Sequence, residues 1–145
     1  MNLVVDTNIV ISALITPKGT ISRLLFQDLA GSQLISPHFL FDEIISKYDK
    51  IQKITILSDE DLKELFYLLI KHIDFIDNDL ISNENQKKAF EIVEVIDKKD
   101  LLFVALSIQT GFSLWSGDLK LINGLKAKGF TSVLKTSEII ERIKK

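Results

Sequence analysis

The chain contains no cysteine, so disulfide bonds, thiolate metal ligands and cysteine nucleophiles are all excluded. Only two prolines and six glycines occur, and neither these residues nor a low-complexity tract marks a domain boundary. No apolar run approaches the length of roughly 18 residues that a membrane-spanning helix needs. The N-terminus also lacks the cationic segment of a secretory signal. We therefore expect a single domain over residues 1–145 that stays in the cytoplasm, with no membrane partner.

The overall charge is only weakly negative, at −2, and does not by itself indicate a nucleic-acid-binding protein. The distribution is uneven, because residues 118–145 contain seven Lys or Arg against three acidic residues, a difference of +4. A solvated helix surface is one explanation of this excess. The other is that Lys120, Lys126 and Lys128 draw a nucleic-acid backbone towards the chain.

Five short apolar stretches have turn or capping residues on their flanks, which is typical of buried strands. They are NLVV (2–5), QLIS (33–36), DFI (74–76), FSLW (112–115) and SVLK (132–135). The longer stretches between them carry apolar residues at helical spacing. Short strands that alternate with helices indicate βαβ units and a parallel sheet covered on both faces.

Capping residues place several helix ends. Ser36 and Pro37 predict a helix start, because Ser caps helices and Pro is tolerated in the first turn. Ser58 predicts the start of another helix, whose first turn is acidic, as the helix dipole favours. A polar helix is predicted over residues 84–95, with Phe90 and Val93 facing inward and Ile92 beside them.

Acidic residues from separate elements are expected at one edge of the sheet, because ligands bind at the carboxyl ends of parallel strands. Asp6 directly follows the first strand and Asp118 lies just past the fourth. Asp100 begins the helix that leads into the fourth strand, so it lies near the same edge. Glu43 lies in the first two turns of the helix after the second strand.

Bare carboxylates do not gather in a water-poor cleft without compensation, because they repel one another and each resists the loss of solvent. A divalent cation resolves this conflict. Oxygen ligands without Cys or paired His favour Mg²⁺ or Mn²⁺. Such a cation suits hydrolysis at phosphorus.

Each acid also has a simpler explanation. Asp6 and Asp100 can each cap a helix, and Asp97 competes with Asp100 for any role. The GD pair at 117–118 is a common turn. Helical phase does not distinguish Glu43 from the acid directly before it.

Four stretches make the chain resemble the PIN-domain family: VVDTNIVISAL (4–14), LFDEIISKY around Glu43, DKKDLLFVALSIQTG (97–111) and LWSGDLKL (114–121). Their order and apolar flanks are similar to the group described as toxin components of toxin–antitoxin systems. The resemblance runs almost from end to end. It implies a three-layer α/β/α fold with a five-stranded parallel sheet, similar to a Rossmann fold.

The resemblance also implies a metal-dependent endoribonuclease that cleaves single-stranded RNA with Mg²⁺ or Mn²⁺ as cofactor. At the matching positions, the catalytic and metal-binding residues are Asp6, Glu43, Asp100 and Asp118. The supporting polar residues are Thr7, Asn8, Ser116 and Asp97. We expect Glu43 to orient or deprotonate the attacking water, or to hold a second cation, while the three aspartates bind the first.

Other readings remain open. A PIN-like scaffold that binds RNA or protein without catalysis would explain the fold equally well. An aspartyl-phosphate phosphatase needs a second Asp where Asn8 stands, and a receiver domain needs a neighbouring acid pair near the first strand. Trp115 either stacks on a base or, as its place in a strand favours, packs in the core. Expected partners are an antitoxin protein and a second copy, bound through the helices of residues 50–73.

Overall fold

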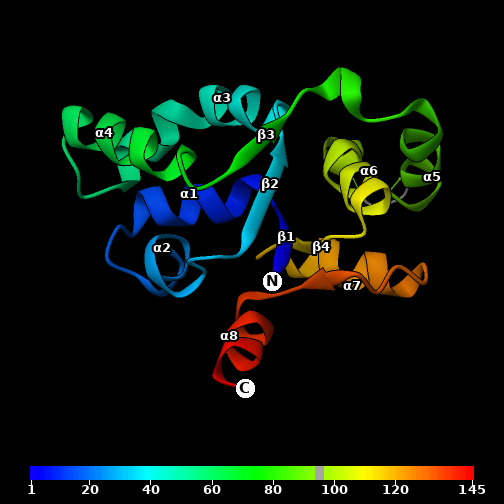
Figure 1. The fold of residues 1–145 in the computed structure, drawn as a ribbon. Helices are drawn as coiled ribbons and strands as arrows, with labels where there is room; N and C mark the ends of the chain where they lie inside the picture. Colours follow the sequence, from blue (N-terminus) through cyan, green and yellow to red (C-terminus); the bar gives the residue numbers. More distant parts are fainter. Residues whose placement is uncertain (94–96) are drawn as a thin grey trace.

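The computed structural model describes residues 1–93 and 97–145 and shows a parallel sheet with helices on both faces (Figure 1). The strands are β1 (Asn2–Val5), β2 (Gln33–Pro37), β3 (Asp74–Ile76), β4 (Ser113–Trp115) and β5 (Val133–Leu134). Their order is β3-β2-β1-β4-β5, and each neighbouring pair is parallel. The predicted α/β fold with a five-stranded parallel sheet is therefore confirmed.

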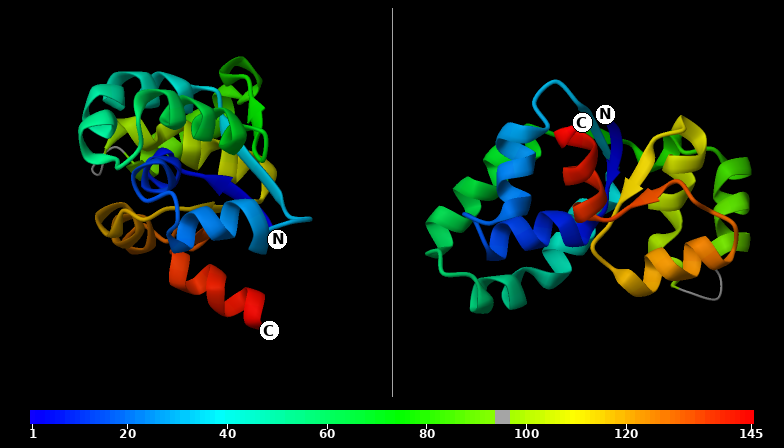
Figure 2. Two further views of the ribbon diagram at one scale, coloured as in Figure 1. Left: turned by 90° about the vertical axis from the view of Figure 1, so that its left-hand side faces the viewer. Right: turned by 90° about the horizontal axis from the view of Figure 1, so that it is seen from below.

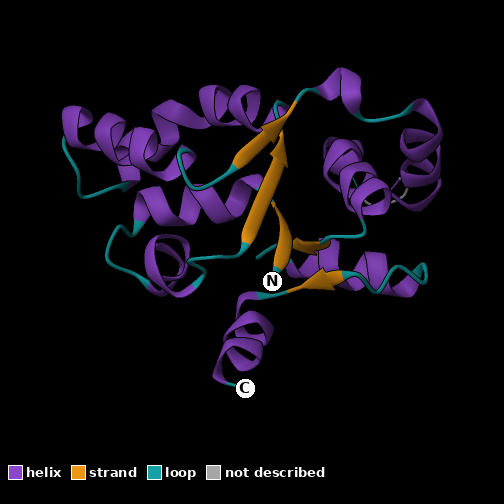
Figure 3. Cartoon of the chain, in the orientation of Figure 1, coloured by secondary structure: helices purple, strands orange, loops and turns teal. Residues whose placement is uncertain are grey.

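The helices form two layers around this sheet (Figure 3). One layer contains α1 (Thr7–Ile15), α2 (Thr20–Arg23), the π-helical turn η1 (Leu24–Asp28), α3 (Phe39–Ile54) and α4 (Asp59–Ile70). The other contains α5 (Asn83–Val93), α6 (Leu101–Thr110) and α7 (Leu119–Ala127), with the 3₁₀ turns η2 (Asn78–Leu80) and η3 (Lys98–Asp100) in the connections. The last helix, α8 (Thr136–Lys144), lies beside α2 and η1 (Figure 2).

Strand β1 is the centre of the sheet and determines where a site can form. Leu3, Val4 and Val5 are fully buried, as expected for a strand covered on both faces. The chain continues from β1 to β2 on one side and returns to β4 on the other. Such a change of direction opens a crevice at the carboxyl ends of the strands. The pairing of Val5 with Trp115 brings the residues that follow these strands side by side at the carboxyl edge of the sheet.

The predicted helix start at Ser36 and Pro37 is wrong, because both residues belong to β2. Pro37 pairs with Ile76 of β3, and the Ser36 hydroxyl donates a hydrogen bond to the Val5 carbonyl oxygen over 2.9 Å. Proline is tolerated at the end of a strand as well as at the start of a helix. The sequence signal was therefore shared by two elements, and α3 begins at Phe39.

The inward orientation predicted for Phe90 is also wrong. Its side chain is 38% exposed, and the Lys98 ammonium nitrogen lies 5.4 Å from the centre of its ring. The inward positions predicted for Val93 and Ile92 are confirmed, because Val93 is fully buried and the partly buried Ile92 packs against the core. Helix α5 also buries Ala89, and the part of the prediction over 94–95 lies outside the described residues. The predicted cap at Ser58 is confirmed, since its hydroxyl accepts the Asp61 backbone N–H over 3.2 Å.

Within residues 1–93 and 97–145, no single helix has both the length and the apolar composition to cross a membrane. Helix α1 and the segment Thr20–Asp28 reach that length only when they are taken together, and a bend of 111° separates them.

Trp115 packs in the core, as favoured from the sequence, and is 0% exposed. Its indole N–H donates to the Thr136 hydroxyl over 3.0 Å. We predict that Thr136→Val lowers the free energy of unfolding by about 1–3 kcal/mol, because a buried donor loses its partner. Urea unfolding followed by Trp fluorescence measures this loss. Thr136→Ser keeps the hydroxyl and serves as the control, so an equal loss in both variants would contradict the hydrogen bond's role.

Candidate active site

Asp6 occupies the end of β1 and is buried, with only 4% of its surface exposed. Its backbone N–H continues the ladder to β4 by donating to the Trp115 carbonyl oxygen over 3.0 Å. Its carboxylate accepts two hydrogen bonds, from the Thr7 backbone N–H over 2.8 Å and from the Ser116 hydroxyl over 2.7 Å. The side chain is thus held from both sides, and its position is set by the pairing of β1 with β4.

Ser116 and Asn8 tie the start of α1 to the loop after β4. The fully buried Ser116 hydroxyl accepts the Asp118 backbone N–H over 3.1 Å while it donates to Asp6. The Asn8 side chain donates to the same hydroxyl over 3.4 Å and accepts the Gly117 backbone N–H over 3.2 Å. Both predicted supporting residues therefore contact the acids or the loop that carries them.

Thr7 connects the first strand to Glu43. Its hydroxyl donates to Glu43 Oε1 over 2.6 Å, a short contact typical of a bond to a charged acceptor. Glu43 lies in α3 and is half-buried, whereas the neighbouring Asp42 is exposed. The structure therefore resolves the choice that helical phase left open, because Glu43 is the acid directed to the carboxyl end of β1.

The structure also distinguishes the role of Asp100 from that of Asp97. Asp97 is exposed, and its carboxylate caps η3 by accepting the Lys99 backbone N–H over 3.0 Å. Asp100 stands at the N-cap position of α6 but makes no capping hydrogen bond. The capping explanation therefore applies to Asp97, while the half-buried Asp100 side chain is left for the acidic cluster.

Asp118 caps a helix and also lies near the other acids of the cluster. Its Oδ1 accepts the backbone N–H groups of Lys120 and Leu121, which caps α7 over 3.0 and 3.2 Å. It is exposed, yet its negative charge raises the pKa values of Asp6 and Asp100. The acid at the end of β4 is thus both a helix cap and a neighbour of the buried aspartates.

The charges of the neighbouring acids contribute to raised pKa values of Asp6 and Asp100. Burial raises the pKa of Asp6 from 3.8 to about 6; the hydrogen bonds from Ser116 and Thr7 oppose this rise, and the charges of Glu43 and Asp118 add to it. Burial likewise raises the pKa of Asp100 to about 7, and further increases come from the charges of Asp6, Asp97, Asp118 and Glu43. The ion pairs of the described residues join Arg23 to Asp28, Lys63 to Asp59 and Lys88 to Glu84, so none neutralises the cluster.

The predicted lysines are not equally placed. Lys120 is exposed in the first turn of α7, beside Asp118. Lys126 and Lys128 are at the opposite end of that helix, about 12–15 Å from Asp118 along its axis. The structure therefore brings Lys120 to the acids but not the other two.

Two lysines near the acids were missed. Lys47 and Lys99 line a pocket of about 240 Å³ together with Glu43. Their positions relative to the predicted acids could have indicated them. Lys47 is four residues after Glu43, and Lys99 immediately precedes Asp100.

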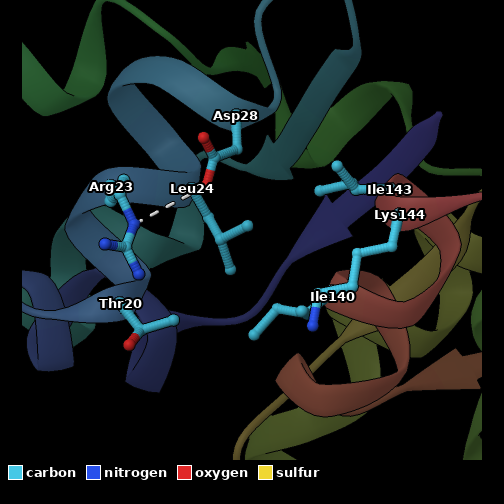
Figure 4. A pocket seen from close by; sticks show the side chains of 7 residues that line it. All are labelled: Thr20, Arg23, Leu24, Asp28, Ile140, Ile143 and Lys144. Atoms are coloured by element: carbon cyan, nitrogen blue, oxygen red, sulfur yellow. Dashed lines mark ion pairs between the residues drawn. The ribbon is translucent and has the colours of Figure 1, made fainter.

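Another pocket, of about 280 Å³, lies between α2, η1 and α8 and contains none of the site acids. Figure 4 shows Arg23 and Asp28 on one wall, facing Ile140, Ile143 and Lys144 of α8. Because no cluster of carboxylates opens into it, we assign the candidate chemistry to the edge of the sheet instead.

Comparison with known families agrees with this geometry, since the family model described as PIN domain matches residues 4–141. The chain belongs to the PIN domain family. Members of this family are typically nucleases that use divalent metals. No curated protein matches the chain at a significant level.

Two crystal structures share the PIN fold with this chain. One is that of VapBC2 from Rickettsia felis bound to a DNA fragment from its promoter. The match covers 93% of the chain described here and 97% of the chain in that structure, with 14% sequence identity and a TM-score of 0.67. The other is that of PAE2754 from Pyrobaculum aerophilum. This match covers 99% of the chain described here and 90% of the chain in that structure, with 9% sequence identity and a TM-score of 0.68. At these identities the likeness establishes the fold alone.

The residues of this PIN domain fit a divalent cation by their chemistry. All the side chains of the cluster supply carboxylate oxygens, the ligands that Mg²⁺ and Mn²⁺ prefer. Among residues 1–93 and 97–145, however, no three His, Cys, Asp or Glu side chains are already close enough to enclose a metal ion. Carboxylates repel one another, so an open arrangement is expected of the cluster without a cation.

The raised pKa values predict how the metal-free protein responds to pH. Asp6 and Asp100 have folded-state pKa values of about 6 and about 7, above the value of about 3.9 for unfolded Asp. The folded state therefore retains protons that the unfolded state loses, and the free energy of unfolding falls as pH rises from about 4 to about 7. Urea unfolding in chelator measures this decrease.

The same argument predicts that Asp6→Asn stabilises the metal-free protein at pH 8 by roughly 1–2 kcal/mol, because a buried charge is removed. At pH 4 the folded-state carboxyl group is protonated and the unfolded-state group is about half protonated, so most of the gain disappears. An equal gain at both pH values, or none at either, would contradict the electrostatic account.

Proposed function

We propose that this PIN domain is a divalent-metal-dependent endoribonuclease that cleaves single-stranded RNA. One observation carries the proposal: Asp6, Glu43, Asp100 and Asp118 come from four different connections and meet at one edge of the sheet without a neutralising cation among the described residues. Holding these charges together is costly unless a cation compensates them. Groups with strongly raised pKa values in a cleft are typical of functional sites.

Each residue of the cluster has a proposed role. Asp6, Asp100 and Asp118 would hold the cation, which when bound would act as a Lewis acid on the phosphodiester and lower the pKa of water. Glu43 Oε1 is occupied by the Thr7 hydroxyl, so Oε2 is the oxygen proposed to accept a proton from the attacking water. Hydrolysis would leave a 3′-hydroxyl and a 5′-phosphate.

The supporting residues act by orientation. Ser116 and the Thr7 backbone hold the Asp6 carboxylate, and Asn8 fixes the loop that carries Asp118. Such outer hydrogen bonds commonly fix the direction of ligating carboxylates. Asp97, which caps η3, is proposed to hold Asp100 in place and to touch waters of the cation.

We predict that the purified chain cleaves single-stranded RNA with Mg²⁺ or Mn²⁺, and that chelator abolishes cleavage. Asp6→Asn and Asp100→Asn should each lower the rate by at least about 100-fold, because the cation loses a charged ligand. Gel analysis of a labelled RNA measures the rate, and matched single-stranded DNA tests the choice of sugar. Asp61→Asn, an exposed acid of α4, is the control. Cleavage that survives chelator and both substitutions would refute the mechanism.

Thermal melting of the wild-type and Asp6→Asn proteins distinguishes a metal-dependent enzyme from a scaffold without catalytic activity. A cation that binds the folded state raises the melting temperature, so Mn²⁺ at millimolar concentration should stabilise the wild-type chain and have a weaker effect on Asp6→Asn. A scaffold without a metal site would show the same melting temperature with and without Mn²⁺ in both chains.

We also propose two protein partners, an antitoxin and a second copy of the chain. The likeness to VapBC2 supports the first. Support for the second comes from large apolar side chains that the described structure leaves exposed in residues 50–73: Ile54, Ile56, Tyr67 and Leu68. Exposed apolar surface of this kind is typical of protein interfaces.

A dimer formed through these helices should dissociate when charge is introduced there. We predict that light scattering after gel filtration gives a dimeric mass for wild type and a monomeric mass for the double variant Ile56→Asp, Leu68→Asp. The control is Leu80→Asp, an exposed apolar residue outside this segment. A monomeric wild type, or a double variant that remains dimeric, would contradict the proposed interface.

A further inference from the structure

We propose that the pocket between α3 and η3 binds the nucleotide next to the cleaved bond, with Lys47 and Lys99 neutralising its phosphate. This inference rests on the proposed ribonuclease function and assigns a substrate subsite to the same edge of the sheet. The pocket has a volume of about 240 Å³ and is lined by Phe39, Asp42, Glu43, Ser46, Lys47 and Lys99.

The position of the pocket follows from Glu43, which it shares with the acidic cluster. Glu43 is held by Thr7 on the side of β1, and the same side chain forms part of the pocket wall. Lys99, which directly precedes Asp100 in η3, lines the same pocket as Glu43. A strand that presents one phosphate to the cluster therefore has this pocket as an adjoining recess.

Lys47 is placed to meet a second phosphate. It follows Glu43 by four residues in α3, so the two side chains lie on the same face of the helix, about 6 Å apart along its axis. That separation is comparable to the spacing of successive phosphates along an extended strand. Lys47 also lines a neighbouring recess formed with Asn8 and Ile51, so it stands where a strand would leave the cluster along α3.

Lys99 supplies positive charge from the other wall. It belongs to η3, a short turn whose start is fixed by the Asp97 cap on the Lys99 backbone N–H. Neither Lys99 nor Lys47 is in an ion pair with any described residue. By contrast, the preceding Lys98 places its ammonium nitrogen 5.4 Å from the Phe90 ring centre and does not line the pocket.

The remaining walls favour a nucleotide over a bare anion. The half-buried Phe39 is held by its backbone N–H, which donates to the Asn78 side chain over 3.1 Å, and by edge contact with Phe103 at 6.4 Å between ring centres. A fixed aromatic ring offers an apolar surface to a base. The Ser46 hydroxyl donates to the Glu43 carbonyl oxygen over 2.9 Å, so its oxygen is left as an acceptor, like the carboxylate of Asp42. Such acceptors suit sugar hydroxyls and base N–H groups rather than phosphate.

The test measures binding separately from cleavage. Affinity for a short, unstructured, fluorescein-labelled single-stranded RNA is determined in the Asp6→Asn background with Mg²⁺ present, by anisotropy. Lys47→Gln and Lys99→Gln are compared with Lys98→Gln and Lys53→Gln, exposed lysines that do not line the pocket. Melting temperatures confirm that all four variants fold. Cleavage kinetics in the chain with native Asp6 supply KM and kcat.

We expect both pocket variants to weaken RNA binding severalfold at low salt and the controls to leave it unchanged. Each lost phosphate contact lowers the slope of log affinity against log salt by about 0.7 for a single strand, measured between about 50 and 200 mM. In cleavage, KM should rise while kcat changes little, as for a contact made equally in the ground state and the transition state.

The outcomes separate this inference from the proposed function. Normal cleavage together with pocket variants that match their controls would overturn the subsite and leave the ribonuclease intact. A chain that cannot cleave RNA, but binds it through Lys47 and Lys99, would refute the ribonuclease and support the pocket as a binding site. A chain in which neither RNA binding nor KM depends on these lysines overturns the subsite whatever its activity.

Discussion

The site depends on one constraint, the burial of the Asp6 carboxylate at the carboxyl end of the central strand. The ladder between β1 and β4 continues through the Asp6 backbone, and Ser116 from the neighbouring strand donates to its side chain. The Asp6 carboxylate is therefore shielded from solvent, and no cationic side chain of the described residues forms an ion pair with it. Burial raises the pKa of Asp6, and the same geometry makes a divalent cation the natural compensation.

The acids of the cluster are held by the same hydrogen bonds that define the fold. Asp6 caps α1, Asp118 caps α7, and Asp97 caps the turn that leads to Asp100. These structural roles do not compete with ligation, because a carboxylate oxygen has two lone pairs and can accept a hydrogen bond while it faces a cation. A helix cap at the end of a parallel strand thus fixes where each of these carboxylates lies.

Much of the fold was predictable from the sequence, because short apolar runs such as NLVV, with turn or capping residues on their flanks, are typical of strands in a sheet covered on both faces. The order of the acids along the chain similarly predicted a common edge. The start of α3 was not predictable, since Ser36 and Pro37 suit both a strand end and a helix start. The choice of Glu43 over Asp42 required the Thr7 contact, and the pocket lysines required the approach of η3 to α3, both long-range contacts without local signals.

The most direct measurement of the central claim is anomalous diffraction from crystals grown with Mn²⁺. The account predicts an anomalous peak bounded by Asp6, Asp100 and Asp118, with carboxylate oxygens at about 2 Å from its centre, as for small divalent cations with hard oxygen ligands. It also predicts loss of the peak in crystals of Asp6→Asn. Saturating Mn²⁺ that leaves this edge of the sheet empty, or that binds only at other acids, would contradict the claim.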